Sequence, residues 1–289
     1  MSDNLCIYHS HCLDGFTSAV IVRNWAKENN IEMEFFAAGY DYAPPDVTGK
    51  TVYIVDFSYK REVLAEMAKI AKKIIIIDHH KTAEENLKDI DLEFDNIEVN
   101  FDMTRSGAML TWHYFNSTTV SPGLVLYVQD HDLWQYKLKN TKEIILALYS
   151  YEMDFDVWEK IFRQDHIAKL ISEGEVLSRQ HFKNCHSTIK SAKYYIVIKD
   201  NIKIPVLNCS PIYSSDIGNI MALDAPYSAT YSIDKNQKVR FSLRSNKDNP
   251  EFMDVSIIAS SFGGGGHLNS SGFYCSLEDF IKFEVIKEE

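Results

Sequence analysis

Four consecutive isoleucines, Ile74–Ile77, restrict the fold of this chain more than any other feature of its sequence. So dense a run of β-branched residues is typical of a strand buried on both faces, as in parallel sheets covered by helices. Amphipathic, helix-like stretches at Phe16–Glu28 and Lys60–Lys72 alternate with further strand-like runs. Those runs are Leu5–Tyr8, Met33–Ala38 and Thr51–Val55. This alternation predicts βαβ units and an α/β fold with a parallel sheet in the N-terminal domain.

The rest of the chain predicts a long helix followed by a smaller α/β domain. Residues 106–165 have a mainly helical pattern, and His166–Ser187 reads as one long helix. Four strand-like runs separated by helical stretches come after it. They are Tyr194–Ile198, Ile202–Leu207, Ser228–Ile233 and Val239–Leu243. We therefore expect one domain over residues 1–165, a connector helix over residues 166–188 and a second domain over residues 189–289.

Charge and composition exclude several classes of protein. The formal net charge of −11 argues against a protein that coats long duplex DNA through many phosphate contacts. No apolar run approaches the ~20 residues of a membrane-spanning helix, and the polar start Met1–Asn4 does not resemble a signal peptide. The five cysteines form no C-x-x-C pair, which fits reduced thiols in a cytoplasmic protein.

Three clusters of acidic, histidine and cysteine side chains each follow a predicted strand directly. They are His9, His11, Cys12 and Asp14 in the first, Asp56 in the second, and Asp78, His79 and His80 in the third. A single Asp after a strand is usually a turn or helix cap, but three titratable residues after four isoleucines need partners. Because the carboxyl ends of parallel strands form a ligand crevice, we expect the clusters to meet. Carboxylates with imidazoles suit Mn²⁺, Zn²⁺, Fe²⁺ or Mg²⁺ better than Ca²⁺.

The motifs resemble those of the DHH phosphoesterase superfamily. Ile77–Thr82 looks like its signature, Leu13–Ala19 is similar to its first motif, and Val55-Asp56 matches the second. Val128–Trp134 resembles the fourth motif, and Gly263–His267 resembles the glycine-rich motif of the DHH-associated substrate-binding domain. The superfamily includes single-strand exonucleases, nano-RNases, pyrophosphatases, exopolyphosphatases and cyclic-dinucleotide phosphodiesterases. The resemblance spans nearly the whole chain, with the motifs in the expected order.

This resemblance implies a metal-dependent phosphoesterase, with the metal in the first domain and the substrate bound by the second. It implies one or two cations, Mn²⁺ first, with Zn²⁺, Fe²⁺ and Mg²⁺ as alternatives. Two cations about 3.5–4 Å apart can activate water and stabilise phosphoryl charge. The implied metal ligands are His9, Asp14, Asp56, Asp78, His79 and Asp130. His80, supported by Asp78, would contact the phosphate or the leaving oxygen as the catalytic group.

One position departs from the family pattern. Related enzymes present two acidic residues separated by one residue in the first motif, and aligning Asp14 with the second places Cys12 at the first. Either Cys12 or a neighbouring histidine such as His11 is then a ligand, or one metal is weakly held or absent. A thiolate ligand would favour Zn²⁺ or Fe²⁺ over Mn²⁺.

Several residues are candidates for contact with the substrate. They are Arg105, Ser106, Arg244, Gly264, Gly265, Gly266 and His267. Glycines let backbone N–H groups approach a phosphate, although most glycine clusters are flexible loops. A guanidinium such as that of Arg244 binds phosphate bidentately. Arg105 and Ser106 open a helix, whose N-terminus is either a phosphate site or simply capped by Ser106.

We expect hydrolysis of phosphodiester bonds in short oligonucleotides or dinucleotides. The alternatives are hydrolysis of phosphomonoesters or phosphoanhydrides, such as pAp, polyphosphate or pyrophosphate, and a nucleotide-binding module without turnover. Side chains that stack on bases would favour phosphodiester hydrolysis, whereas a purely basic pocket would favour phosphomonoester or phosphoanhydride hydrolysis. Trp134, Tyr136 and Tyr149 are expected in the core, with a stacking role for one of them as the other interpretation. The retained acidic and histidine residues argue against a module without turnover.

Overall fold

The computed structural model describes the chain except for residues 1, 40–41, 117–119, 164–165, 199–200 and 287–289. It divides into two compact units, Met1–Ser178 and Arg179–Glu289. Helix α9 (Ile167–Ala192) crosses the boundary between them, where the sequence predicts one long helix. Among the residues described, no helix combines the length and the apolar character needed to cross a membrane.

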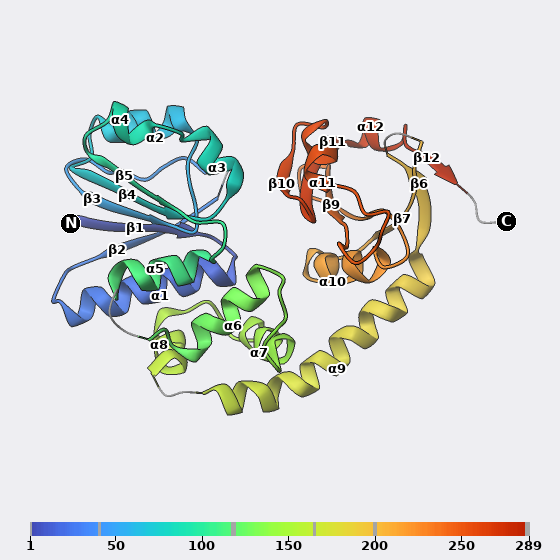
Figure 1. Cartoon of the computed structure of the whole chain (residues 1–289), viewed down its shortest axis with the longest axis horizontal. Helices are drawn as coiled ribbons and strands as arrows, with labels where there is room; N and C mark the ends of the chain where they lie inside the picture. Colours follow the sequence, from blue (N-terminus) through green and yellow to red (C-terminus); the bar gives the residue numbers. More distant parts are fainter. Residues whose placement is uncertain (1, 40–41, 117–119, 164–165, 199–200, 287–289) are drawn as a thin grey trace. The chain divides into compact units, whose positions relative to one another are not determined.

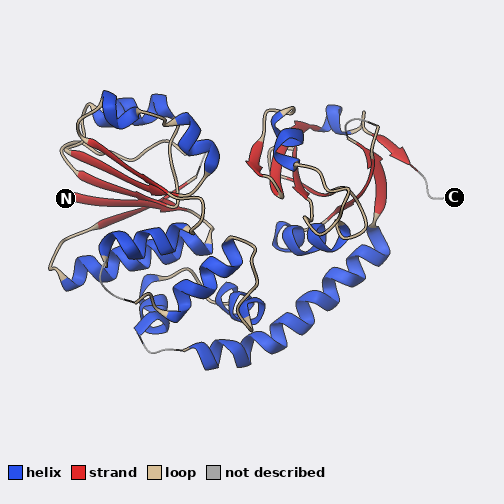
Figure 2. Ribbon diagram, viewed as in Figure 1, coloured by secondary structure: helices blue, strands red, loops and turns tan. Residues whose placement is uncertain are grey.

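The first unit is built on a parallel sheet with the strand order β2-β1-β3-β4-β5. Its strands are β1 (Asn4–His9), β2 (Glu34–Ala38), β3 (Thr51–Val55), β4 (Lys73–Asp78) and β5 (Ile97–Phe101). The isoleucines of β4 are at most 2% exposed, because helices cover both faces of the sheet (Figure 2). The predicted α/β class and the buried central strand are therefore confirmed.

Helices α2 to α4 cover one face of this sheet, and α1 and α5 cover the other (Figure 1). The helices are α1 (Leu13–Glu28), α2 (Arg61–Ala68), α3 (Lys81–Asn86), α4 (Ile90–Glu93), α5 (Gly107–Phe115), α6 (Gly123–Asp132), α7 (Thr141–Tyr149) and α8 (Phe155–Arg163). A further core lies among α1 and α5 to α8, where the rings of Phe16 and Trp158 meet edge to face at 5.2 Å between centroids. This core fixes the position of α6, whose last turn carries two acidic residues.

The second unit contains a mostly antiparallel sheet with the order β10-β11-β9-β8-β7-β6-β12, in which β7 and β8 are parallel. Its strands are β6 (Tyr194–Val197), β7 (Lys203–Asn208), β8 (Ser228–Ile233), β9 (Lys238–Arg244), β10 (Gly265–His267), β11 (Ser270–Ser276) and β12 (Glu284–Ile286). Its helices beyond α9 are α10 (Pro211–Met221), α11 (Val255–Ser260) and α12 (Leu277–Phe280). Phe241 and Phe273 stack in its core at 4.9 Å between ring centroids, beside Ile258 of α11.

Candidate active site

Strand register brings the polar clusters to one edge of the first sheet. Tyr8 of β1 pairs with Val55 of β3, and Val55 pairs in turn with Ile77 of β4. The next residue of each strand is therefore delivered to the same edge. These next residues are His9, Asp56 and Asp78. The predicted convergence thus follows from parallel pairing of three strands in equal register.

His79 lies at the centre of this edge. Its Nε2 atom is 3.1 Å from Oδ1 of Asp56, 3.5 Å from Oδ2 of Asp132 and 3.7 Å from Oδ2 of Asp14. Three carboxylates, from the start of α1, the end of β3 and the end of α6, surround one imidazole nitrogen. We call these four residues the His79 centre. So much negative charge in a buried place requires compensation by protons or by a cation.

The electrostatics of the His79 centre reflect this concentration of charge. Burial, and then the charges of Asp56 and Asp132, raise the pKa of Asp14 well above its ordinary value. Burial also raises the pKa of Asp132. Burial alone would lower the pKa of His79, but its hydrogen bond to Asp56 and the surrounding carboxylates raise that pKa well above the ordinary value. Without a cation, the centre therefore holds protons strongly.

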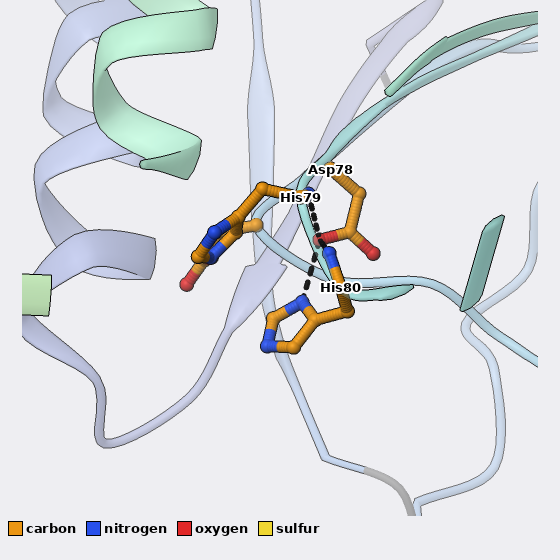
Figure 3. A group of neighbouring side chains, drawn as sticks. Asp78, His79 and His80 are labelled. Atoms are coloured by element: carbon orange, nitrogen blue, oxygen red, sulfur yellow. Dashed lines mark hydrogen bonds and ion pairs between the residues drawn. The ribbon is translucent and has the colours of Figure 1, made fainter. Parts of the chain in front are cut away.

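Asp78 and His80 form a second pair beside this centre (Figure 3). Oδ1 of Asp78 accepts hydrogen bonds from the backbone N–H of His79 at 2.7 Å and from Nδ1 of His80 at 2.6 Å, and Oδ2 accepts one from Ser58 at 2.6 Å. Burial alone would raise the pKa of Asp78, but the charge and hydrogen bond of His80 hold it below its ordinary value. The same interaction with Asp78 raises the pKa of His80 against the effect of burial. Asp78 therefore orients both histidines.

Three groups of side chains at this edge could each hold a metal ion. Within each group, the potential ligand atoms all lie within 4.8 Å of one another. The groups are Asp56, Asp78, His79 and His80; His9, Cys12 and Asp56; and Asp14, His79 and Asp132. Asp56 and His79 each belong to two groups, an arrangement suited to two neighbouring cations. Carboxylates with imidazoles fit Mn²⁺, Fe²⁺, Zn²⁺ or Mg²⁺, so the residues present fit the implied metal.

Asp130, predicted as a metal ligand, makes different contacts. Its Oδ1 accepts a hydrogen bond from Lys137 N at 2.8 Å, and its Oδ2 accepts from Leu138 N at 3.1 Å and Thr141 Oγ1 at 2.5 Å. Residues two apart on a helix do not share a face, so Asp132 reaches the His79 centre while Asp130 faces the following loop. The prediction is wrong by two residues, because one motif contains both aspartates.

Cys12 lies beside the candidate metal ligands, as the alignment of the first motif predicts. Its sulfur is within 4.8 Å of ligand atoms of His9 and Asp56, and burial, with the charge of Asp56, raises the pKa of its thiol well above the ordinary value. Nδ1 of His9 is 3.6 Å from Oδ2 of Asp56. His11 occupies an exposed turn with a φ of 55° and belongs to none of the three groups formed by the described residues.

The N-terminus of α5 contacts a carboxylate of the site. The backbone N–H groups of Gly107 and Ala108 donate to Asp14 at 2.6 and 3.0 Å, so these two donors serve Asp14 instead of the phosphate that the sequence predicts. Ser106 caps the helix by accepting from Met109 N at 3.3 Å. Nε of Arg105 lies 3.4 Å from Asp102 Oδ2. The capping interpretation of this segment is correct.

Sequence patterns did not reveal Gly107 as a residue of the site. A Cβ at this position would lie 2.5 Å from Cβ of Asp56, so only glycine lets α5 approach the end of β3 so closely. Gly15 has a similar role, since a Cβ there would lie 2.5 Å from the carbonyl oxygen of His9. Gly15 could be recognised from the sequence because it follows Asp14 in the first motif. None of the motifs described above contains Gly107.

The predicted substrate residues of the second unit belong to β9 and to the segment of β10, two strands that are separated in the sheet by β11. Arg244, at the end of β9, donates from Nη2 to Ser215 Oγ at 2.8 Å and from Nη1 to the Leu243 carbonyl at 2.8 Å. A cavity of about 90 Å³ adjoins it. Its lining residues are Cys209, Pro211, Ser214, Ser215, Tyr231, Ser232, Arg240, Ser242 and Arg244. The second unit thus has a small pocket with two arginines and several hydroxyl groups.

Part of the glycine run forms a strand, since Gly265, Gly266 and His267 form β10 against β11. A Cβ on Gly264 would lie 2.1 Å from the carbonyl oxygen of Gly272, and Gly266 has a φ of 140°. Packing and backbone conformation therefore require glycine at these two positions. The flexible-loop interpretation of the run does not hold for β10.

Comparison with known proteins identifies the family. A family model described as the DHH family, N-terminal domain, matches residues 4–150, which cover the sheet and every residue of the His79 centre. The chain belongs to the DHH family. The resemblance inferred from the motifs is thereby confirmed, and with it the prediction that the protein is an enzyme of the phosphoesterase class.

Two known proteins are similar in sequence to this DHH-family protein over most of its length. The uncharacterised protein R106 of Acanthamoeba polyphaga mimivirus is 31% identical over 313 residues, covering 99% of this chain and 70% of the relative. Oligoribonuclease NrnB of Bacillus subtilis is 24% identical over 254 residues. That match covers 80% of this chain and 60% of the oligoribonuclease.

Solved structures share the fold at low sequence identity. The pGpG-specific phosphodiesterase PggH from Vibrio cholerae superposes with a TM-score of 0.54 and 14% identity, covering 96% of this chain and 95% of that one. RecJ from Thermus thermophilus, solved in complex with Mn²⁺, has a TM-score of 0.52 and 13% identity, covering 96% of this chain and 50% of RecJ. These likenesses establish the DHH fold of the chain.

Proposed function

We propose that this DHH-family protein hydrolyses phosphodiester bonds in short oligonucleotides or dinucleotides, with one or two divalent cations at the edge of its first sheet. The observation that carries the proposal is the approach of Asp14, Asp56 and Asp132 to Nε2 of His79. A cation held there would activate water and stabilise the charge that develops on the phosphoryl oxygens.

The side chains have separate tasks in this proposal. Asp14, His79 and Asp132 would hold one cation, and Asp56 with His9 and Cys12 would hold a second one. Backbone N–H groups of α5 fix the carboxylate of Asp14 through its two hydrogen bonds. Fixed ligands lose little conformational freedom on binding, which favours a tightly held ion.

His80 is the proposed catalytic acid. Its Nδ1 donates to the buried carboxylate of Asp78 at 2.6 Å, and this contact raises the pKa of His80. The contact therefore favours the imidazolium over the neutral imidazole, and Nε2 is the atom that would donate a proton to the leaving oxygen. Asp78 acts through His80 and through the backbone N–H of His79, so it is a positioning residue.

Short nucleotide substrates agree best with the observations. An oligoribonuclease is among the relatives and a pGpG-specific phosphodiesterase is among the proteins of the same fold. The net charge of −11 disfavours long polyanions. We propose that residues 189–289 contribute substrate contacts through Arg244 and His267. The two arginines of the cavity in the second unit support a second candidate activity, on phosphomonoesters or phosphoanhydrides.

A substrate panel with Mn²⁺ tests the proposal. We expect di- to pentanucleotides to be hydrolysed faster than pAp, pyrophosphate, polyphosphate or a long duplex, and we expect no hydrolysis in excess chelator. Asp132→Asn should abolish the activity, whereas Asp91→Asn, at an exposed position of α4, should keep it. Faster hydrolysis of polyphosphate than of dinucleotides would overturn the substrate assignment. Full activity after verified metal removal would overturn the mechanism.

A further inference from the structure

The loop between α6 and α7 has an unusual backbone. Trp134 has a φ of 53° and Tyr136 a φ of 48°, two residues apart. Bulky aromatic residues seldom adopt this left-handed conformation, because their Cβ atoms crowd the backbone. Two such residues within one short loop indicate that the surrounding structure imposes the conformation, and such imposed conformations concentrate at functional sites.

Asp130, in the last turn of α6, holds the loop in this conformation. Its carboxylate accepts hydrogen bonds from Lys137 N, Leu138 N and Thr141 Oγ1. Its carbonyl oxygen accepts from Gln135 N at 2.9 Å and from Tyr136 N at 3.3 Å. One buried residue thus binds both the middle and the end of the loop. The carboxylate of Asp130 is thus occupied by hydrogen bonds to this loop, and the same hydrogen bonds hold the loop in its conformation.

The result of this conformation is an exposed indole. Trp134 is 39% exposed, although a large aromatic ring normally gains from burial. Its ring contacts Tyr136 edge to face at 4.9 Å between centroids and His131 at 5.8 Å. His131 Nδ1 and Tyr136 Oη lie 2.9 Å apart, within hydrogen-bonding distance. Neighbouring rings therefore support the indole while part of it stays accessible.

The indole is anchored next to the His79 centre. Asp132, whose Oδ2 is 3.5 Å from Nε2 of His79, precedes Trp134 by two residues. Two trans peptide units span at most about 7.6 Å between Cα atoms, so the backbone of Trp134 lies close to that of a proposed metal ligand. The base next to a phosphate held at the centre would therefore lie near the backbone that carries the indole.

We propose that Trp134 is a stacking platform for the nucleobase adjoining the phosphate held at the His79 centre. This inference rests on the proposed function and names the part of the substrate that is recognised. Stacking on an aromatic ring accepts every base, so the platform selects nucleotides as a class without reading their sequence. Polyphosphate and pyrophosphate have no ring to stack, so the platform favours nucleotides over both.

Steady-state kinetics on a dinucleotide and on its abasic counterpart test the platform. Base stacking contributes about 1–3 kcal/mol, so Trp134→Ala should raise the KM for the dinucleotide about 5- to 150-fold, with little change in kcat. Trp134→Phe keeps a ring and should stay close to wild type. Neither variant should change the KM of the abasic substrate. The matched control is Leu126→Ala, at another exposed apolar side chain of this region.

A binding measurement separates this inference from the proposed activity. The chain has four tryptophans, and AMP should quench part of their fluorescence in the wild type but not in Trp134→Phe. An equal loss on the dinucleotide and the abasic substrate in Trp134→Ala would assign Trp134 a structural role only and overturn the platform. Unchanged dinucleotide kinetics would also overturn it. If the wild type hydrolyses no dinucleotide, the proposed activity fails, while the AMP measurement still decides whether Trp134 binds a base.

Discussion

Nε2 of His79 lies 3.1 Å from Oδ1 of Asp56, and this contact joins two neighbouring strands at the point where the candidate metal groups overlap. His79 follows β4 and Asp56 follows β3, and both side chains are almost fully buried. Removing either residue should therefore disturb more than one ligand group. The predictions below examine this centre and the residues that support it.

We expect His79→Ala to lose metal and activity together. Loss of a residue shared by two ligand groups should weaken metal affinity by at least the roughly 10- to 100-fold typical of supporting residues. The bound metal should be counted by elemental analysis after dialysis, and Mn²⁺ affinity measured by calorimetry. His186→Ala, on α9 and in none of the three groups, is the matched control. Wild-type Mn²⁺ affinity in His79→Ala would contradict the assignment.

Asp130 and Asp132 should give opposite results despite their proximity in sequence. Asp132→Asn should reduce metal content while thermal stability in the metal-free state stays the same or rises, because a charge of the same sign as those of Asp14 and Asp56 is removed. Asp130→Asn should retain metal but lower the free energy of unfolding by about 1–3 kcal/mol, because asparagine keeps only one of the two oxygens that accept the hydrogen bonds of Lys137, Leu138 and Thr141. Calorimetric scans of both metal-free variants make the comparison. A large loss of metal with unchanged stability in Asp130→Asn would return Asp130 to the ligand set.

Metal affinity should increase as pH rises. Because the pKa values of Asp14, Asp132 and His79 are raised, the metal-free centre keeps protons at pH values where these groups are ordinarily less protonated. A cation must displace those protons, so lower pH favours the protonated, metal-free state and higher pH favours binding. Calorimetry of Mn²⁺ binding in buffers with different ionisation enthalpies should reveal proton release. Binding without proton release, and with a constant Kd between pH 6 and pH 8, would contradict this.

Gly107→Ala should damage the site although it replaces no proposed ligand. The new Cβ would lie 2.5 Å from Cβ of Asp56, so α5 or the end of β3 must shift. Overpacking of this kind costs about 1–3 kcal/mol, and we expect weaker metal binding as well. The matched control is Gly123→Ala, at the first residue of α6. Its new Cβ would lie 3.8 Å from the side chain of Ile167, which is an ordinary contact distance. Equal metal affinity and melting temperature in the two variants would show that the close approach at Gly107 is unimportant.

Cys12 should be visible in the spectrum of the cobalt-substituted protein. Thiolate coordination gives Co²⁺ a charge-transfer absorption in the near ultraviolet, which we expect in the wild type and not in Cys12→Ser. Cys12→Asp should shift the preference from Zn²⁺ toward Mn²⁺, because a hard oxygen ligand replaces a soft sulfur. Cys209→Ser, in the second unit, is the control. Identical cobalt spectra for the wild type and Cys12→Ser would exclude the thiolate from the coordination sphere.

Much of the fold follows from local patterns in the sequence. The isoleucines before Asp78 specify a doubly buried strand, and parallel strands paired in equal register deliver the residues that follow them to one edge. His9, Asp56 and His79 therefore meet for reasons that can be derived from burial and register alone. The glycine that follows Asp14 was likewise visible in its motif.

Other parts of the site depend on packing between distant elements. The sequence does not distinguish Asp130 from Asp132, because their roles depend on the rotation of α6, which is set by its packing against α1 and α7. Gly107 becomes a site residue only because α5 meets the end of β3, and Trp134 stays exposed only because Asp130 holds its loop. Periodicity and strand order are local properties that can be read along the chain. The rotation of a helix and the close approach of two backbones depend on side chains far apart in sequence, and these emerge only when the core is packed.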